Sequence, residues 1–261
     1  MDLNLQGKIA VVTGGSKGIG LACARELARE GARVTIISRD AANIETARKQ
    51  LAAEGFEVSG LAANLSDYAS AVDAVSKIES DVGPIDVLVN SAGAAKRYDP
   101  DTLDGEALRA GMEAKYFPIV NMQEAVLQRM RTRKRGAIVN IIGNGGKVGT
   151  AMHISGGAAN AAAMLSTVGL ASYYASQGIR INGINPGGTL TDRVNEGLAV
   201  ESKRSGISID DALARAQSAV PMGRFAKPEE VAEVAVFLAS DRASYVTGAI
   251  VPMDGGKNPI V

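Results

Sequence analysis

The sequence predicts an α/β fold: a single Rossmann-type, doubly wound parallel sheet of about seven strands with helices on both faces. Short apolar runs alternate with longer segments of helical period, a glycine-rich turn follows the first run, and no linker or repeat divides the 261 residues. Such alternation is typical of βαβ units, whose parallel strands are covered on both faces. We therefore expect one nucleotide-binding domain over residues 1–261, a length that can bury a full core.

The expected strands are short apolar runs between more polar segments. They are residues 8–13 (KIAVVT), 33–38 (RVTIIS), 57–63 (EVSGLAA), 85–90 (IDVLVN), 136–142 (GAIVNII), 180–185 (RINGIN) and 249–253 (AIVPM). The connections carry a helical period, shown in the first by Leu21, Ala24, Leu27 and Ala28. Each connection is therefore expected to be a helix.

The longest expected irregular segment runs from Pro186 to Pro221. It holds a short polar helix pattern around Asp210 to Ser218. Long loops in compact domains are often functional, so residues 186–221 are a candidate cover for a substrate.

Composition limits the partners and the location. The 28 acidic and 28 basic residues balance, so neither nucleic acid nor an anionic membrane is an expected partner. Cys23 is the single cysteine; it cannot form an internal disulfide and is interpreted as a small core residue. The first residues match neither a signal peptide nor a membrane span, which favours a cytoplasmic location. No metal site is predicted.

The first chemical motif is TGGSKGIG, residues 13–20, which follows a predicted strand and opens a predicted helix. Glycines there allow a tight turn, so that a pyrophosphate can approach the backbone N–H groups and the positive end of the helix dipole. The alternative is a glycine-rich turn without a ligand, which the flanking strand and helix disfavour.

Three further motifs occur in order: NSAG at 90–93, Pro186-Gly187, and PMGRFAKPEEVAEVAVFLAS with YVTGAIVPMDGG toward the end. Together with the glycine turn, they make nearly the whole chain resemble the short-chain dehydrogenase/reductase family. The resemblance implies an oxidoreductase that uses a nicotinamide cofactor and a small-molecule substrate.

The resemblance also implies which residues contact the cofactor. Gly14, Ser16, Ile19 and Gly20 would hold the pyrophosphate and ribose; Asn90, Ala92 and Gly93 would lie on the adenosine and ribose side; Pro186, Gly187, Thr189 and Thr191 would flank the nicotinamide. Asn64-Leu65 stands where the family usually has an aspartate that reads the adenine amino group, and an asparagine oxygen can still accept that hydrogen bond.

The end of the second expected strand indicates which cofactor is preferred. It reads Ile37-Ser38-Arg39 and lacks the carboxylate that would bind the ribose hydroxyls of NAD. Arg39 offers a guanidinium suited to a 2′-phosphate, and Lys17 adds a second cation. The sequence therefore favours NADP(H) over NAD(H), although two solvated surface cations would give the same pattern.

The stretch HISGGAANA, residues 153–161, is unusual for this family. By resemblance, the tyrosine that donates the proton and the lysine four residues later fall on Gly156 and Asn160. The usual serine falls on Gly143, and the usual asparagine falls on Lys115, in a helix that Pro118 is expected to bend or interrupt. No Tyr-x-x-x-Lys occurs in the chain, so a shift of one residue does not restore the motif.

Losing the acid predicts weak alcohol and ketone turnover, because general acid catalysis typically contributes about 10²- to 10⁴-fold. A cationic substrate such as an iminium, a substrate that protonates itself, or a relocated acid would restore the reaction. Lys115 and Asn160 suggest that ammonium and amide have exchanged helices, with His153 nearby. Lys115 as an exposed helix cation and His153 without chemistry are the alternatives.

Two functions therefore remain open at this point. One is an NADP(H)-dependent oxidoreductase with a non-standard active site, and the other is an inactive subunit or NADP(H) sensor that partners an active homologue. Small residues dominate 156–175, which favours close helix packing in a homo- or hetero-oligomer; packing on the chain's own sheet is the alternative. Tyr173-Tyr174 is interpreted as packing or interface.

Overall fold

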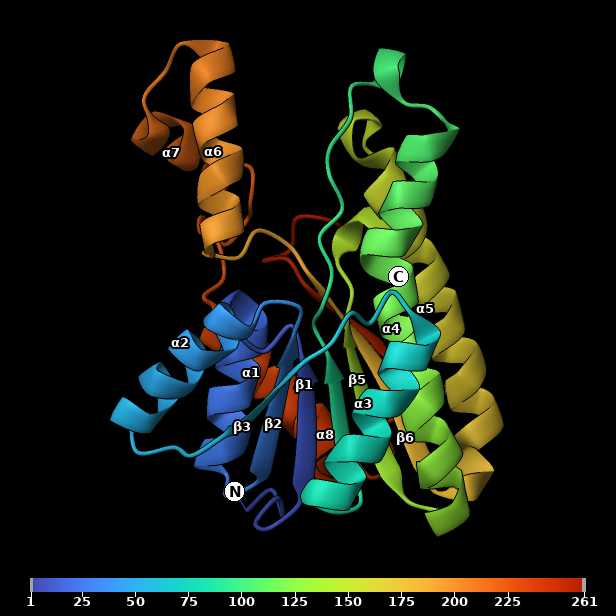
Figure 1. Ribbon diagram of the computed structural model, residues 1–261. Coiled ribbons are helices and arrows are strands. Elements are labelled where there is room, and N and C mark those ends of the chain that lie inside the picture. The colour runs from blue at the N-terminus through green and yellow to red at the C-terminus, as the bar shows by residue number, and fades with distance from the viewer. Residues whose placement is uncertain (1, 260–261) are drawn as a thin grey trace.

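The computed structural model describes residues 2–259 and contains a seven-stranded, all-parallel sheet in the order β3-β2-β1-β4-β5-β6-β7 (Figure 1). The strands are β1 Ile9–Thr13, β2 Arg33–Ser38, β3 Ser59–Ala62, β4 Val87–Asn90, β5 Gly136–Ile141, β6 Ile179–Pro186 and β7 Ile250–Met253. Each lies within one or two residues of an apolar run in the sequence. The predicted fold class is confirmed.

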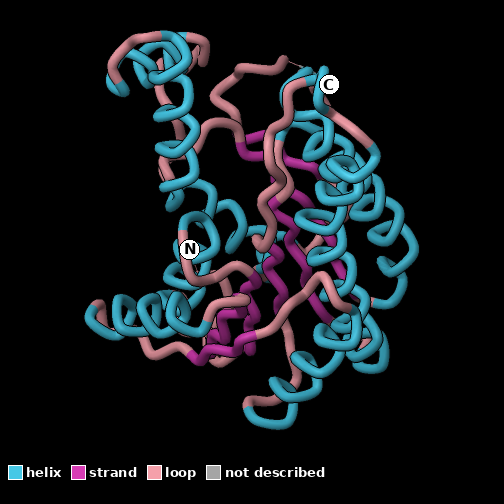
Figure 2. Tube along the Cα trace, turned by 45° about the horizontal axis from the view of Figure 1, so that its top comes forward, coloured by secondary structure: helices cyan, strands magenta, loops and turns pink. Residues whose placement is uncertain are grey.

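Helices cover both faces of the sheet, with α1, α2 and α8 on one face and α3, α4 and α5 on the other (Figures 1 and 2). They are α1 Gly18–Arg29, α2 Ala41–Ala53, α3 Tyr68–Asp81, α4 Gly105–Arg133, α5 Ile154–Tyr174, α6 Asp192–Ser205, α7 Ile209–Ser218 and α8 Pro228–Ala239. Short 3₁₀ turns are η1 Pro100–Thr102, η2 Asn144–Gly146, η3 Ala151–His153, η4 Ala175–Gln177 and η5 Asp241–Ala243.

The two-residue period of β1 places its side chains in two separate cores. Ala10 and Val12 pack with α1 and α8, whereas Ile9 and Val11 pack with α3 and α4. Strands buried on both faces must be apolar at successive positions, which explains why the sequence shows continuous apolar runs. Cys23 lies in the first core, where burial raises the pKa of its thiol to about 12. It therefore has the inert core role expected of it.

Strand β1 is the point from which the sheet grows in both directions. It pairs with β2 on one side and β4 on the other, with Thr13 opposite Asn90. In open α/β sheets, ligands bind outside the carboxyl ends of the strands at such a switch point. The fold thus directs attention to the segments that follow β1 and β4.

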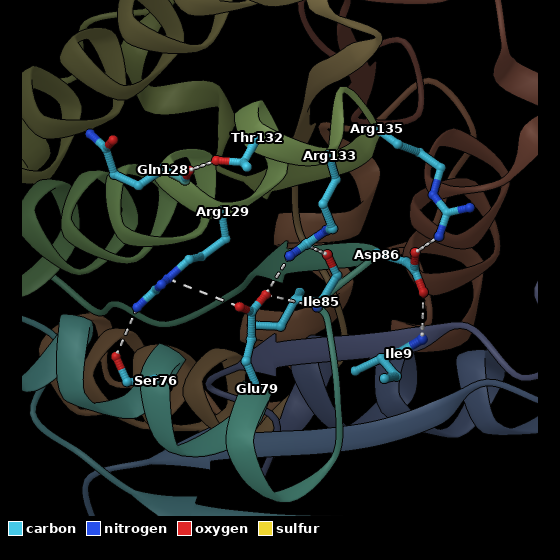
Figure 3. A network of polar contacts seen from close by, with 10 residues as sticks. All are labelled: Ile9, Ser76, Glu79, Ile85, Asp86, Gln128, Arg129, Thr132, Arg133 and Arg135. Atoms are coloured by element: carbon cyan, nitrogen blue, oxygen red, sulfur yellow. Dashed lines mark hydrogen bonds and ion pairs between the residues drawn. The ribbon is translucent and has the colours of Figure 1, made fainter.

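A polar network lies at the opposite end of the sheet, where the strands begin (Figure 3). Glu79 of α3 accepts hydrogen bonds from Nη1 of Arg133 at 2.9 Å and from the backbone N–H of Ile85 at 3.1 Å. Asp86 accepts from Nη2 of Arg135 at 2.6 Å and from the N–H of Ile9 at 3.1 Å. These bonds tie α3 and α4 to the starts of β1 and β4, far from the switch point.

Pro118 was expected to bend or interrupt its helix, and the interruption does not occur. Helix α4 continues through Pro118 from Gly105 to Arg133. Proline has no N–H for the carbonyl four residues earlier, which is that of Ala114, and this carbonyl accepts the N–H of Ala94 at 3.2 Å. The proline thereby leaves an acceptor that fastens the segment after β4 to α4.

The expectation of a long irregular segment at 186–221 is also wrong in part. Besides α7, which matches the predicted pattern around 210–218, the segment contains α6. Helix α6 is highly polar and stands beyond the carboxyl ends of the strands (Figure 1). Its low apolar content explains why the sequence did not reveal it.

The helical segment Ala151–Gln177 contains an 18-residue stretch that is long and apolar enough to span a membrane, but half of that stretch is buried inside the protein. Core helices of water-soluble proteins share these properties. Within this segment, α5 packs against α4 and β6.

Candidate active site

The glycine turn forms a tight backbone cradle between β1 and α1. Gly14 has φ +65°, and a Cβ there would lie 2.8 Å from the Ser91 carbonyl oxygen; a Cβ on Gly20 would lie 2.2 Å from the Gly14 oxygen. Among the described residues, no side chain caps the start of α1 and its first turn has no acidic residue. The first N–H groups of the helix are therefore available to an anion, and the site fits a pyrophosphate.

The segment after β4 is supported from below by buried polar side chains. The Thr13 hydroxyl accepts the N–H groups of Ser91 and Ala92 at 3.1 and 3.2 Å and donates to Oδ1 of Asn90 at 3.3 Å. Asn90 is fully buried and donates to Oδ1 of Asn140 at 2.9 Å. It therefore lies beneath the site, whereas Ala92 and Gly93 retain exposed surface.

The segment after β6 returns to the glycine turn. A Cβ on Gly18 would lie 3.3 Å from Cγ2 of Thr191, and a Cβ on Gly187 would lie 2.9 Å from Asp254. Thr189 is buried, and its backbone pairs with that of Ala226. Thr191 is thus brought beside the glycine turn that contains Ser16 and Ile19, and Gly187 and Thr189 lie between it and Pro186 at the end of β6.

At the adenosine side, Ser38 ends β2, and Arg39 and Lys17 are exposed. Neither cation forms an ion pair with another described residue. Asn64 is exposed, and its Oδ1 accepts the N–H of Ser66 at 3.3 Å, while Leu65 is buried. The two cations remain open to a phosphate.

Lys115 and Asn160 converge on Gly143 from α4 and α5. A Cβ on Gly143 would lie 3.3 Å from Nδ2 of Asn160 and 3.7 Å from Nζ of Lys115, which donates a hydrogen bond to the carbonyl of Ile142. Gly143 has φ +124°, a conformation in which a serine would be strained. The amide of Asn185 holds this turn, since its Oδ1 accepts the Gly143 N–H at 3.3 Å.

The imidazole of His153 stands beside the same pair. A Cβ on Gly156 would lie 2.2 Å from Cε1 of His153, and a Cβ on Gly145 would lie 2.8 Å from Cδ2. His153 is partly buried, and its Nδ1 has no hydrogen-bond partner among the described residues; the same is true of Oδ1 of Asn160. Two unsatisfied polar atoms thus lie next to the Lys115 ammonium.

Small residues explain how these side chains come so close. A Cβ on Gly111 of α4 would lie 2.7 Å from the Ser155 carbonyl, and a Cβ on Gly157 of α5 would lie 2.7 Å from the Gly145 carbonyl. Any larger residue would push α4, α5 and η2 apart. Within 156–175, Gly157 therefore allows close packing inside the chain, which is one of the two roles considered for the small residues of this stretch.

The electrostatics of the site differ from those of an exposed surface. Burial, and secondly the charge of Arg193, lower the pKa of Lys115 from 10.5 to about 7. Burial also lowers the pKa of His153, followed by the charges of Lys115, Arg97 and Arg193. Near pH 7, Lys115 is thus close to half protonated and His153 is neutral, so the interpretation of Lys115 as an exposed helix cation is wrong.

Sequence reasoning missed several residues of this site. Thr13, Asn185 and Asn144 support its turns, and Arg97 and Arg193 bring charge to it. Asn144 donates to Oδ2 of Asp254 at 2.9 Å. Arg193 lies within the predicted cover 186–221 but on a helix, α6, that was not predicted, and Arg97 lies in an irregular segment.

The chain is similar to known oxidoreductases along nearly its whole length. The family of enoyl-(acyl carrier protein) reductases matches residues 14–258. D-threitol dehydrogenase of Mycolicibacterium smegmatis is 34% identical over 259 residues, covering 98% of this chain and 94% of that protein. The NADPH-dependent reductase BacG of Bacillus subtilis is 34% identical over 255 residues, covering 96% and 97%.

Solved structures agree with this similarity. L-sorbose reductase from Gluconobacter frateurii, in complex with NADPH and L-sorbose, superposes with a TM-score of 0.93 at 30% identity and covers 100% of both chains. The NADPH in that complex and the NADPH dependence of the Bacillus relative bear out NADP(H) as the expected cofactor.

Proposed function

The chain belongs to the short-chain dehydrogenase/reductase family, and we propose that it is an NADPH-dependent reductase with a non-standard active site in which Lys115 donates the proton. The observation that supports this proposal most directly is that Lys115 Nζ and the Asn160 amide both lie close to Gly143, with His153 beside them. This is the oxidoreductase option of the two functions considered above.

Three groups of residues are assigned to the cofactor. The glycine turn with Gly14, Ser16, Ile19 and Gly20 would hold the pyrophosphate, and Lys17, Ser38 and Arg39 the 2′-phosphate. Ala92 and Gly93, supported by buried Asn90, would lie on the adenosine and ribose side, residues 186–191 at the nicotinamide, and Asn64 and Leu65 at the adenine. NADPH, when bound, supplies a hydride.

Lys115 supplies the proton that the usual tyrosine would give. As a carbonyl carbon accepts hydride, its oxygen gains negative charge; the Lys115 ammonium donates a proton to that oxygen and becomes a neutral amine, which takes up a proton from solvent. A pKa of about 7 suits this role, because an acid is most effective when its pKa is near the working pH. The bond from Nζ to the Ile142 carbonyl orients the ammonium.

Asn160 and His153 are positioned to assist. The Asn160 amide presents Nδ2 beside the turn at Gly143 and can donate to the developing oxyanion. Neutral His153 fills the space next to Gly156, so a tyrosine side chain has no room to project there while the imidazole keeps its place. We assign it a positioning role toward Lys115 and Asn160.

The proposed oligomer rests on apolar side chains that are exposed on α5. Leu165, Val168 and Tyr173 of α5 are exposed, Leu165 to 77% and Tyr173 to 68%. Apolar side chains gathered on one helix favour contact with another subunit, so we propose a homo-oligomer, with a homologue as the alternative partner. We also propose a cytoplasmic location, and α6 and α7 as the cover of the substrate.

Oxidation of NADPH with a panel of aldehydes, ketones and imines tests the function. Lys115→Met should lower kcat/KM by about 10²-fold or more, the usual contribution of a general acid, without changing the Kd for NADPH by more than about twofold. Lys77→Met, an exposed lysine of α3 paired with Asp81, is the control and should keep full activity. Cofactor binding without turnover on any substrate would instead favour the sensor or partner function.

A further inference from the structure

Three basic side chains, Arg97, His153 and Arg193, come from three segments to the region of the proposed proton donor. Arg193 of α6 donates from Nη2 to the carbonyl of Ala95 at 2.8 Å, so α6 contacts the segment that carries Arg97. That segment also contacts the start of α5, where Ser155 Oγ donates to the Lys96 carbonyl at 3.3 Å. In this arrangement the charge of Arg97 acts on Arg193, and the charges of both arginines act on His153.

These charges have little compensation. Within residues 2–259, no ion pair includes Arg97, Lys115 or Arg193. Asp192 lies in the same first turn of α6 as Arg193, and the charge of Glu196 acts on Arg193. Like charges that lie this close together repel one another, and the fold by itself does not keep them apart.

The position of Arg193 in its helix is a second reason why its positive charge is unfavourable. It lies in the first turn of α6, which begins at Asp192 and has no side-chain cap. The amino-terminal end of a helix is its positive end and favours anions over cations. A cation held there, on which the charge of Arg97 also acts, is stabilised when an anion binds beside it.

We propose that Arg97 and Arg193 form a subsite for a carboxylate on the substrate, next to the carbonyl that Lys115 protonates. The subsite rests on the proposed function, because it assigns the substrate class of the same site. Guanidinium groups match a planar carboxylate with paired hydrogen bonds. The same charges repel a cationic substrate, so an oxo acid fits this site better than an iminium.

The single histidine provides a probe that requires no resonance assignment. The His153 imidazole is followed by NMR as pyruvate, phenylpyruvate or benzoate is added, each paired with its neutral amide, in protein with and without NADP⁺. A carboxylate bound near Arg97 and Arg193 should offset their charges and raise the pKa of His153, whereas the amides should not. Equal responses to acid and amide, or no response to any acid, would overturn the proposal.

Variants decide which residues hold the anion. Arg193→Gln and Arg97→Gln should weaken carboxylate binding about tenfold or more and leave the Kd for NADPH within about twofold. Arg204→Gln, an exposed arginine of α6 paired with Glu201, should change neither. A loss of NADPH binding in Arg193→Gln or Arg97→Gln would assign the cluster to a cofactor phosphate and overturn the proposal.

The carboxylate assay does not depend on turnover. If the acids bind as expected but no oxo acid is reduced, the proposed reduction fails and the subsite stands. If oxo acids and their methyl esters are reduced with equal kcat/KM, the reductase stands and the carboxylate subsite is overturned. The two proposals can therefore fail separately.

Discussion

The imidazole of His153 occupies the space into which a side chain on Gly156 would project, since a Cβ on Gly156 would lie 2.2 Å from its Cε1. Glycine at this position is therefore part of the packing of the site. The position where the family resemblance places a tyrosine is filled by a side chain from three residues earlier.

Gly156→Ala should lower the free energy of unfolding by about 1–3 kcal/mol, because the added methyl group overlaps the His153 ring. The penalty should disappear in a His153→Ala background, where the helix gains from alanine. Gly169→Ala serves as the control; no atom lies within 4 Å of a Cβ there, so it should stabilise α5 by up to about 1 kcal/mol. Urea denaturation measures the wild type, the two single variants at 153 and 156, the double variant and Gly169→Ala, and an equal penalty with and without His153 would contradict the overlap.

The kcat/KM for NADPH-dependent reduction should depend on an acid with a pKa of about 7, that of Lys115. Because the ammonium is the active form, kcat/KM should be highest below pH 7 and fall as the pH rises through about 7. Arg193→Gln removes a like charge, so the falling limb should move to higher pH. Lys115→Arg keeps its charge over this range and should give a lower, flat profile. A descending limb that persists in Lys115→Arg would assign the titration to another group.

Arg39→Ala should weaken NADPH binding about tenfold or more, as expected for losing hydrogen bonds to a charged phosphate, and leave NADH binding unchanged. Arg33→Ala is the matched control, since Arg33 is exposed at the opposite end of the same strand. Titration of both cofactors by their fluorescence gives the two Kd values. Equal losses for NADPH and NADH would show that Arg39 does not contact the 2′-phosphate.

Glu79→Ala should destabilise the fold without altering cofactor binding. It removes the acceptor of the Ile85 N–H and the partner of Arg133 at the amino-terminal edge of the sheet (Figure 3). Leaving these partly buried groups unpaired costs about 1–3 kcal/mol. Asp81→Ala breaks the exposed pair with Lys77 and should cost at most about 1 kcal/mol. Thermal and urea unfolding compare the two, and similar losses would show that the network adds nothing beyond a surface pair.

The sequence by itself determined the sheet and the cofactor cradle. Apolar runs such as 9–13 and 33–38 predict strands because a strand buried on both faces must be apolar throughout. Glycines at 14 and 20 predict close backbone approach, and a Cβ at either position would overlap neighbouring backbone. These signals are local, so they can be read along the chain.

Tertiary structure alone decided how the catalytic region is assembled. Pro118 was expected to bend or interrupt α4, but the helix continues through it, and the missing N–H leaves the Ala114 carbonyl to accept the Ala94 N–H. Asn90 was expected at the cofactor and lies buried beneath the loop. Arg97 and Arg193 reach the site from an irregular segment and from a helix with few apolar residues, and the lowered pKa of Lys115 depends on burial between distant segments. Such effects arise from contacts between residues far apart in the chain, which no local pattern encodes.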